Sequence, residues 1–214
     1  MKKLILSLAV VAIALTSCKG EKKVETKEEV KVEEKVTDPV NSYNVNVAES
    51  TVTWKGDKAV GGGHNGTIGL EKGLFDVENG LVKAGEFTFD MNSISCTDLE
   101  AGKGKEKLEG HLKAADFFDV EKFPTAKFEV ASSEVKEGKL HITGNLTIKD
   151  VTKSITVPAT LTENGNDITL KSDTFMVDRT DFGVQYNSGK FFEDLKDKAI
   201  NDLVEFSFEL KARK

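Results

Sequence analysis

Three charged residues that stand close together near the end of the chain, Asp178, Arg179 and Asp181, are the first candidates for chemistry. Two adjacent carboxyl groups can serve as the acid and the base of a hydrolysis. The same residues can also form a salt-bridged corner at the end of a strand, and this structural role is the one we expect. Arg179 has another use, since a guanidinium group suits the oxygens of a pyrophosphate or the polar head of a quinone.

The three histidines, His64, His111 and His141, do not show the paired spacing of a metal site. His64 follows a run of glycines and is a candidate for contact with the head group of a ligand. We expect His111 to make hydrogen bonds within a local helix, near Asp116, and His141 to face solvent because it is out of phase with its apolar neighbours. Neither a metal nor a cofactor is predicted.

The remaining composition favours binding over catalysis. No Gly-x-Ser-x-Gly nucleophile motif is present, and Cys96 is interpreted as a buried thiol without a chemical role. The chain has 13 Phe against one Trp and two Tyr. Phe has no polar tip, so its ring needs hydrocarbon neighbours, which a core or an apolar ligand supplies. The net charge of -6 gives no electrostatic reason to expect nucleic acid as a partner.

Strands must position these residues, because apolar and polar side chains alternate with period two from residue 43 onward. Hairpin turns are predicted at residues 137–138, 149–150 and 164–165, and a bulge near 172–174. About eight antiparallel strands with one apolar face close into a barrel or split into a sandwich. The closing strand, which holds Phe206 and Phe208, pairs with the first strand or, if left exposed, with a second molecule in a homodimer.

One segment, residues 108–124, interrupts the strands with helix-like character and an aromatic end formed by Phe117, Phe118 and Phe123. A short helical insertion of this kind is expected to cover one end of a barrel. Phe117 and Phe118 would then act as a gate between the interior and the solvent. We therefore place the function at this end of the predicted barrel.

The first residues are typical of an exported lipoprotein. Lys2 and Lys3 precede an apolar run that is too short to span a bilayer but suits a secretory leader over residues 1–17. The run ends at Leu15-Thr16-Ser17-Cys18, which resembles the bacterial lipoprotein cleavage box. Acylated Cys18 would anchor the protein to a membrane of the cell envelope, facing the periplasm or the outside. An ordinary leader with an incidental cysteine is the alternative.

Residues 18–42 then read as a tether. The stretch consists mainly of Lys, Glu and Val and contains no aromatic residue, so it offers little apolar surface to offset the entropy of ordering. We expect a flexible connection between Cys18 and a folded domain over residues 43–214.

The motifs of the folded part occur in an order that resembles the YceI-like, polyisoprenoid-binding family from about Tyr43 to Ala212. The matching stretches are Trp54-Lys55-Gly56, Gly63-His64-Asn65-Gly66-Thr67-Ile68, His111-Leu112-Lys113-Ala114-Ala115-Asp116-Phe117-Phe118-Asp119, Phe123-Pro124, Ile142-Thr143-Gly144-Asn145-Leu146-Thr147-Ile148, Val151-Thr152-Lys153 and Asp178-Arg179-Thr180-Asp181-Phe182-Gly183-Val184. The resemblance implies an all-β fold, an eight-stranded antiparallel lipocalin-like barrel. It also implies a long-chain isoprenoid lipid, polyprenyl or quinone-like, held in the interior without catalysis.

Aromatic side chains are the expected lining of such an interior, although each can equally be ordinary core. The candidates are Trp54, Phe87, Phe89, Phe117, Phe118, Phe123, Phe128, Phe175, Phe182, Phe206 and Phe208, with His64 and Arg179 as candidates for head-group contact. Two other readings stay open. One is an envelope enzyme that uses Asp178, Asp181 or His64, and the other is a barrel filled by its own side chains that serves as a surface interaction module.

Overall fold

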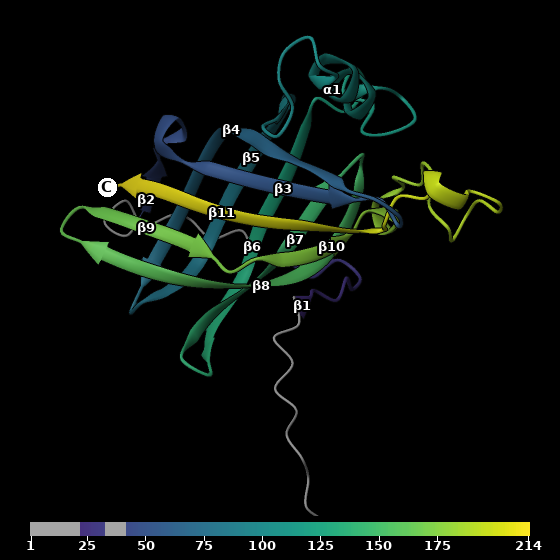
Figure 1. Ribbon diagram of the computed structural model, residues 1–214. Helices are drawn as coiled ribbons and strands as arrows, with labels where there is room; N and C mark the ends of the chain where they lie inside the picture. The colour runs from purple at the N-terminus through teal and green to yellow at the C-terminus, as the bar shows by residue number, and fades with distance from the viewer. Residues whose placement is uncertain (1–21, 33–41) are drawn as a thin grey trace, which may run out of the picture.

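The structure, a computed structural model, describes residues 22–32 and 42–214. Its strands belong to one sheet that closes into a ring of eight, the predicted lipocalin-like barrel, with one short helix over one end (Figure 1). The elements in chain order are β1 (Lys22–Lys23), β2 (Ser42–Val45), β3 (Thr51–Asp57), β4 (Gly63–Glu78), β5 (Leu81–Cys96), α1 (Lys105–Lys113), β6 (Thr125–Lys136), β7 (Lys139–Ile148), β8 (Val151–Asn164), β9 (Asp167–Ser172), β10 (Phe175–Asp178) and β11 (Leu203–Arg213). Three short 3-10 helices complete them, Val47–Glu49, Arg179–Phe182 and Lys196–Lys198.

The ring is antiparallel and is closed by its last strand. Neighbours along the chain pair from β4 to β9, and β11 then pairs with β9 through Leu210 and Leu170. On its other side β11 pairs with β3 and β2, which share one place between β11 and β4. The closing strand β11 therefore pairs with β2 and β3 near the start of the same chain, which is the first of the two pairings considered from the sequence.

Local sequence explains the hairpins. Glu137 and Gly138 join β6 to β7 with positive φ angles of 52° and 76°, and Lys149 and Asp150 join β7 to β8 with φ angles of 51° and 60°. Positive φ at both central residues matches the twist of the flanking strands, which is why two-residue turns of this type make tight hairpins. The third predicted turn follows Asn164, where Gly165 has a φ angle of 63°.

The strand irregularity expected near residues 172–174 is a complete break. β9 ends at Ser172 and β10 begins at Phe175, and both run along β11. The Asp173 N–H still donates to the Pro158 carbonyl at 3.0 Å. From Val151 up to this bond, β8 pairs with β7 but with no named strand on its other edge. The barrel wall therefore lacks direct strand pairing between β8 and β10.

The predicted insertion over residues 108–124 is helical only in its first part. α1 starts at Lys105, after Gly104 with a φ angle of 104°, and ends at Lys113, and turns follow up to β6. Glu109 ties the helix to the barrel, because its carboxylate accepts hydrogen bonds from the Ser95 hydroxyl and the Cys96 N–H of β5. The aromatic end of the segment therefore lies in turns.

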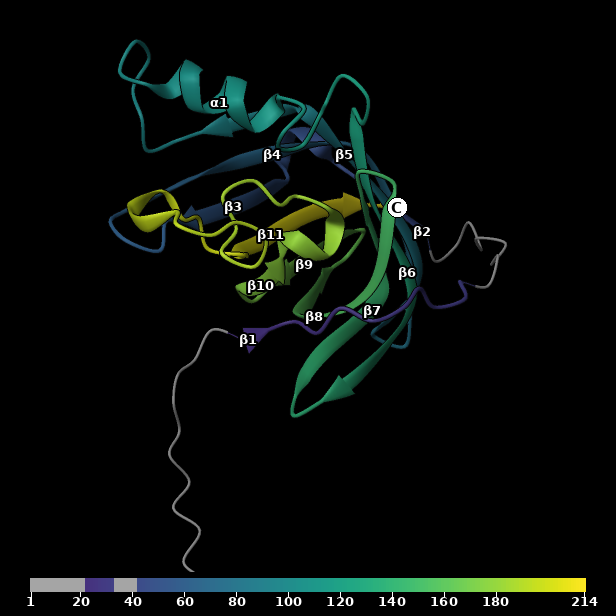
Figure 2. The same cartoon turned by 90° about the vertical axis from the view of Figure 1, so that its right-hand side faces the viewer.

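Residues 22–32, within the stretch expected to be a flexible tether, lie along the barrel wall (Figure 2). Composition could not reveal this, because main-chain hydrogen bonds rather than apolar side chains make most of the contact. The predicted leader and Cys18 lie outside the described residues. Within the described residues, no helix has the length and apolar character needed to cross a membrane.

Candidate functional site

The barrel interior contains an apolar cavity of about 110 Å³. Alternate residues of the barrel strands point into it, so the wall is almost entirely hydrocarbon. Phe128 of β6 reaches the cavity because it packs against Gly144 of β7, where a Cβ atom would stand 2.6 Å from the ring. The predicted residues that line this cavity are Phe87, Phe89, Phe118, Phe128, Phe175, Phe206 and Phe208.

A second cavity of about 470 Å³ lies under α1 and has a mixed lining. Trp54, Ile94, Leu112 and Phe117 give it an apolar wall, and polar groups stand among them. Of the predicted residues, Trp54, His64, Phe117, Phe118, Arg179 and Phe206 line this cavity. Trp54 adds an unusual feature: its Nε1 is buried and has no hydrogen-bond partner within the described residues. A buried donor without an acceptor is costly, but this N–H is not exposed to the mixed cavity, so a ligand oxygen would reach it only after side chains moved.

Three side chains, Phe118, Ile68 and Phe206, line both cavities. The two spaces therefore adjoin at these three side chains. Phe118 is half-buried and extends from the turns that follow α1, whereas Ile68 and Phe206 belong to barrel strands. Phe118 thus stands where the apolar cavity and the mixed cavity adjoin, and its role as a gate between the interior and the solvent stays a prediction.

Phe117 stands beside Phe118 in an aromatic group. Its ring meets Phe118 at 5.1 Å between centroids and His111 at 5.8 Å, and Tyr186 packs edge-on against His111 at 4.5 Å. The His111 Nε2 lies 3.3 Å from an Asp116 carboxylate oxygen, as expected for a hydrogen bond within the insertion. These contacts hold the turns against the barrel end, and Tyr186 was missed because no local pattern marks it.

Arg179 lines the mixed cavity, but most of its donors are already used. The guanidinium donates to the carbonyls of Asn201 at 3.1 Å, Val184 at 2.8 Å and Ile200 at 3.1 Å, and it contacts Asp202 at 3.4 Å. Burial lowers the pKa of Arg179, and the neighbouring carboxylates work against this effect. About one of its five N–H groups is left for a ligand, so Arg179 offers positive charge more than direct contact.

Asp178 forms the structural corner expected from the sequence. Its buried carboxylate accepts hydrogen bonds from the Lys190 ammonium at 2.6 Å and from the hydroxyl and N–H of Thr180 at 2.6 and 3.1 Å. Burial acts to raise the pKa of Asp178, but the bonds from Lys190 and Thr180 outweigh it and lower the pKa. Asp181 accepts a hydrogen bond from Thr26. Both carboxylates are thus engaged, and neither lines the two cavities.

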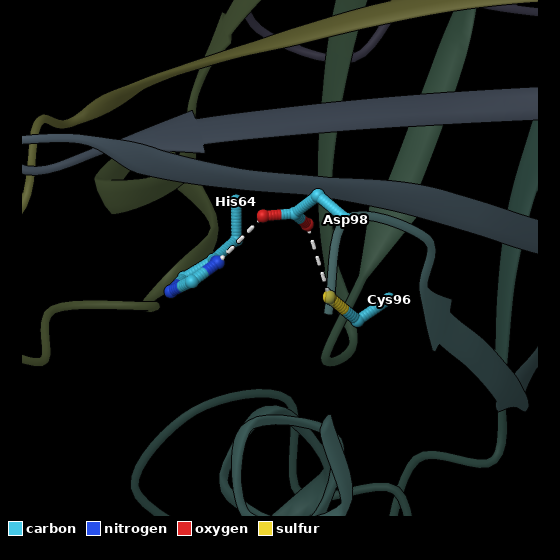
Figure 3. Close-up of side chains that lie close together, drawn as sticks. All are labelled: His64, Cys96 and Asp98. Atoms are coloured by element: carbon cyan, nitrogen blue, oxygen red, sulfur yellow. Dashed lines mark hydrogen bonds and ion pairs between the residues drawn. The ribbon is translucent and has the colours of Figure 1, made fainter. Parts of the chain in front are cut away.

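His64, Cys96 and Asp98 form a hydrogen-bonded group at the edge of the mixed cavity (Figure 3). The Asp98 carboxylate lies 2.9 Å from the His64 Nδ1 and accepts the Cys96 thiol at 3.0 Å and the Asn65 N–H at 2.9 Å. Burial acts to raise the pKa of Asp98, but these hydrogen bonds outweigh it and lower the pKa. Burial, together with the bond to Asp98, raises the pKa of the Cys96 thiol.

The donor atoms of these three residues lie within 4.8 Å of one another, close enough to share a metal ion. A metal would have to remove the thiol proton, whose pKa is raised, and replace hydrogen bonds that already satisfy Asp98. We therefore interpret the group as a clamp between the start of β4 and the end of β5. Sequence reasoning missed it, because its members come from two strands whose register was unknown.

Two predicted lining residues lie elsewhere in the described chain. Phe182 is fully buried and packs with Val177 and Ile155 in the core, and Phe123 is half-buried beneath the Lys122 ammonium, 4.8 Å from its ring centroid. The aliphatic part of the apolar wall went unpredicted, because nothing in the sequence separates it from ordinary core. It comprises Val52, Ile68, Met91, Ala126, Ile142, Leu146, Ile148, Ile155, Val157, Leu170, Val177 and Leu210.

Comparisons with known proteins agree with this architecture. Residues 43–212 match the model of the YceI-like domain. Protein YceI of Salmonella arizonae and a UPF0312 protein of Pseudomonas paraeruginosa are each 37% identical over 93 residues, 44% of this chain and 45% of the relative. The matched stretch thus spans about half the length of these relatives.

Two solved structures share the fold. The protein BcnA of Burkholderia cenocepacia superposes with a TM-score of 0.62 at 22% identity, covering 78% of this chain and 98% of BcnA. A domain from Saccharophagus degradans, described as polyisoprenoid-binding, gives a TM-score of 0.57 at 11% identity, covering 81% of this chain and 98% of the domain. Since the family match spans most of the sequence, the chain belongs to the YceI-like domain family.

Proposed function

We propose that the barrel binds a long-chain isoprenoid lipid, with the hydrocarbon tail in the apolar cavity and the polar head in the mixed cavity. The observation that carries the proposal is the pairing of the two spaces, which adjoin at Phe118, Ile68 and Phe206. An amphiphile with one apolar and one polar end matches this arrangement. The domain from Saccharophagus degradans, described as polyisoprenoid-binding, supports the same class of ligand.

The energetics favour a tail without polar groups. Each buried CH₂ contributes about 0.8 kcal/mol, so a prenyl chain gains affinity from its length alone. The apolar cavity of about 110 Å³ is smaller than the range of about 300–1,000 Å³ common for ligand pockets. Binding must therefore move Phe118 and join the cavities. The gain from the tail offsets this rearrangement and the ordering of the ligand.

The head group would lie among partly engaged polar groups. Trp54 has a buried N–H without a partner within the described residues, Arg179 contributes buried positive charge, and the His64 side chain is 38% exposed. A phosphate or quinone head satisfies such a set of donors. The carboxylates of Asp178 and Asp181 are held by Lys190, Thr180 and Thr26, which supports binding without catalysis.

We also propose that the protein is anchored to a membrane of the cell envelope. Export by a leader over residues 1–17 and acylation of Cys18 would anchor the barrel to a membrane of the cell envelope, where isoprenoid lipids reside. The expected partners are the lipid and the membrane. Palmitate labelling of the full chain and of Cys18→Ser tests this part, and equal labelling of the two proteins would refute it.

Mass spectrometry of a solvent extract from the purified full chain tests the ligand. We expect a prenyl lipid in stoichiometric amount, and we expect added polyprenol to raise the melting temperature. Phospholipid or fatty acid in place of a prenyl lipid would refute the proposed ligand class. Turnover of an added lipid or glycan that is lost in Asp178→Asn or His64→Ala would instead establish an enzyme.

A further inference from the structure

The barrel wall has a seam between β8 and β10. β8 pairs with β9 from Ala159 to Asn164, and the last bond across this joint is the one from Asp173 to Pro158. Toward its first residue, Val151, β8 has β7 on one side only. β10 pairs with β11 on one side. The edges of β8 and β10 thus face the same gap, with main-chain groups that need partners.

Residues 22–30, here called the strap, fill this seam (Figure 2). β1 runs parallel to β10, and the Val24 N–H donates to the Met176 carbonyl at 2.9 Å. On the other edge, Lys27 and Ser154 exchange two main-chain hydrogen bonds, each of 2.9 Å. The strap is therefore an added strand that crosses from β10 to β8 and completes the wall.

The end of the strap is held by a buried amide. The Asn145 side chain of β7 is 1% exposed, and its oxygen accepts the Val30 N–H at 3.0 Å. Its nitrogen donates to the Val30 carbonyl at 2.7 Å. Without the strap, both halves of this amide would lose the partner they have here. Asn145 lies in phase with the polar His141, Thr143 and Thr147 of β7, on the side away from the cavity, and its burial is explained by its contact with the strap.

The strap also closes off the apolar cavity. Val24 is 7% exposed and packs in one cluster with Ile155, Val157, Phe175 and Val177. These four residues line the apolar cavity. Removing the strap would therefore uncover the outer side of the cavity wall, at the place where β8 and β10 are not paired with each other.

Besides its main-chain bonds, the strap is held by the Asn145 amide and by the bond from Thr26 to Asp181, and it has little apolar contact. Val24 is its one buried apolar side chain among those described. In its ion pairs the strap residue is solvent-exposed: Glu28 pairs with Lys153 at 3.0 Å, and Lys23 reaches the buried Asp178 at a long 3.4 Å, where Lys190 is already bound at 2.6 Å. Exposed ion pairs add little stability. A segment with this balance opens locally while the rest of the barrel stays folded.

We propose that the strap is a detachable strand and that lipid enters and leaves the barrel sideways, through the seam between β8 and β10. The inference rests on the proposed function and specifies its route. A sideways route lets a long tail lie down in the interior along its length. The covered end, where α1 and Phe117 stand, then needs to admit the head group only.

A disulfide across the seam tests the route. Lys27 and Ser154 form a hydrogen-bonded antiparallel pair, whose Cα atoms are about 5.5 Å apart, within the range of a disulfide. The full chain with Cys18→Ser, Lys27→Cys and Ser154→Cys is compared, oxidised and reduced, in uptake of an NBD-labelled polyprenol. The matched control is Thr162→Cys with Thr169→Cys, which joins β8 to β9 where they are already paired.

Oxidation of the Lys27–Ser154 pair should slow uptake by at least about tenfold, reduction should restore it, and the control should be unaffected. If the oxidised protein takes up lipid at the wild-type rate, the sideways route is refuted and the proposed lipid binding is not affected. Absence of uptake by the unmodified chain would overturn the proposed function, and this route with it.

Hydrogen exchange gives a second test that needs no ligand. The amides of Val24 and Lys27 should exchange about a hundredfold faster than those of Leu170 and Leu210 in the closed part of the ring. Equal protection would mean that the strap is a permanent strand, and the inference would fail.

Discussion

Filling the apolar cavity should stabilise the empty protein and weaken its binding of lipid at the same time. Ala126 of β6 is buried and lines this cavity, and Leu in its place would add three carbon atoms to a space of about 110 Å³. At about 0.8 kcal/mol per buried carbon, the gain is about 2.4 kcal/mol. About 0.5–1 kcal/mol of it is lost to the ordering of the Leu side chain.

The net gain for Ala126→Leu is thus about 1.5 kcal/mol, which corresponds to a rise of about 3–6 °C in melting temperature for a domain of this size. A prenyl tail would lose the space of about three carbons, or about 2.4 kcal/mol, so its Kd should rise roughly fiftyfold. Differential scanning calorimetry of the empty protein and fluorescence titration with a labelled polyprenol measure the two effects.

Ala159→Leu is the matched control. Ala159 is fully buried in a packed core cluster and does not line the cavity, so the same added atoms should destabilise the protein by about 1–3 kcal/mol. If Ala126→Leu leaves polyprenol affinity unchanged while raising the melting temperature, the lipid does not occupy this cavity. If Ala126→Leu destabilises the protein as Ala159→Leu does, the apolar cavity has no room for the larger side chain.

Three further predictions follow from single side chains. The lowered pKa of Asp178 means that its contribution to stability is present above about pH 3.8 and is lost as pH falls through the lower folded value. Asp178→Asn should therefore lower the free energy of unfolding in urea by about 1.5–3 kcal/mol at pH 7, because the bond from Lys190 is lost. The free energy of unfolding should also fall less steeply at acid pH than in the wild type, and an unchanged acid dependence would contradict this. Because the Cys96 thiol is buried and its pKa is raised, it should be alkylated more slowly in the folded protein than in the unfolded chain, as measured by mass spectrometry in a Cys18→Ser background; equal rates would refute this. Phe118→Ala should destabilise by about 1–3 kcal/mol, less than the roughly 3–5 for a fully buried Phe, and should speed polyprenol uptake in stopped-flow measurements by joining the cavities; slower uptake would argue against a gate.

The parts of the fold that could be predicted are those with a local cause. Period-two alternation and two-residue turns depend on neighbouring residues, so the hairpins after Lys136 and Ile148 were found. The Phe-rich wall was found because Phe has few uses other than hydrocarbon contact. Aliphatic wall residues such as Val157 were not, because they look the same in a wall and in a core.

Features that depend on register could not be predicted. The group of His64, Cys96 and Asp98 forms only because β4 and β5 pair with Gly66 opposite Cys96. The strap depends on main-chain bonds to β8 and β10, which leave almost no trace in side-chain composition apart from Val24. Sequence patterns record which side chains avoid water, and they do not record which strand edges lack a neighbour.

The ring is completed by β11, which pairs with β2, β3, β9 and β10. Of these partners, β2 and β3 are separated from β11 by most of the barrel sequence, so closure of the ring is expected to be a late and slow step in folding. Until β11 (residues 203–213) is in place, the chain can form the hairpins from β4 to β9 but cannot close the barrel, and its apolar inner face stays open to chaperones.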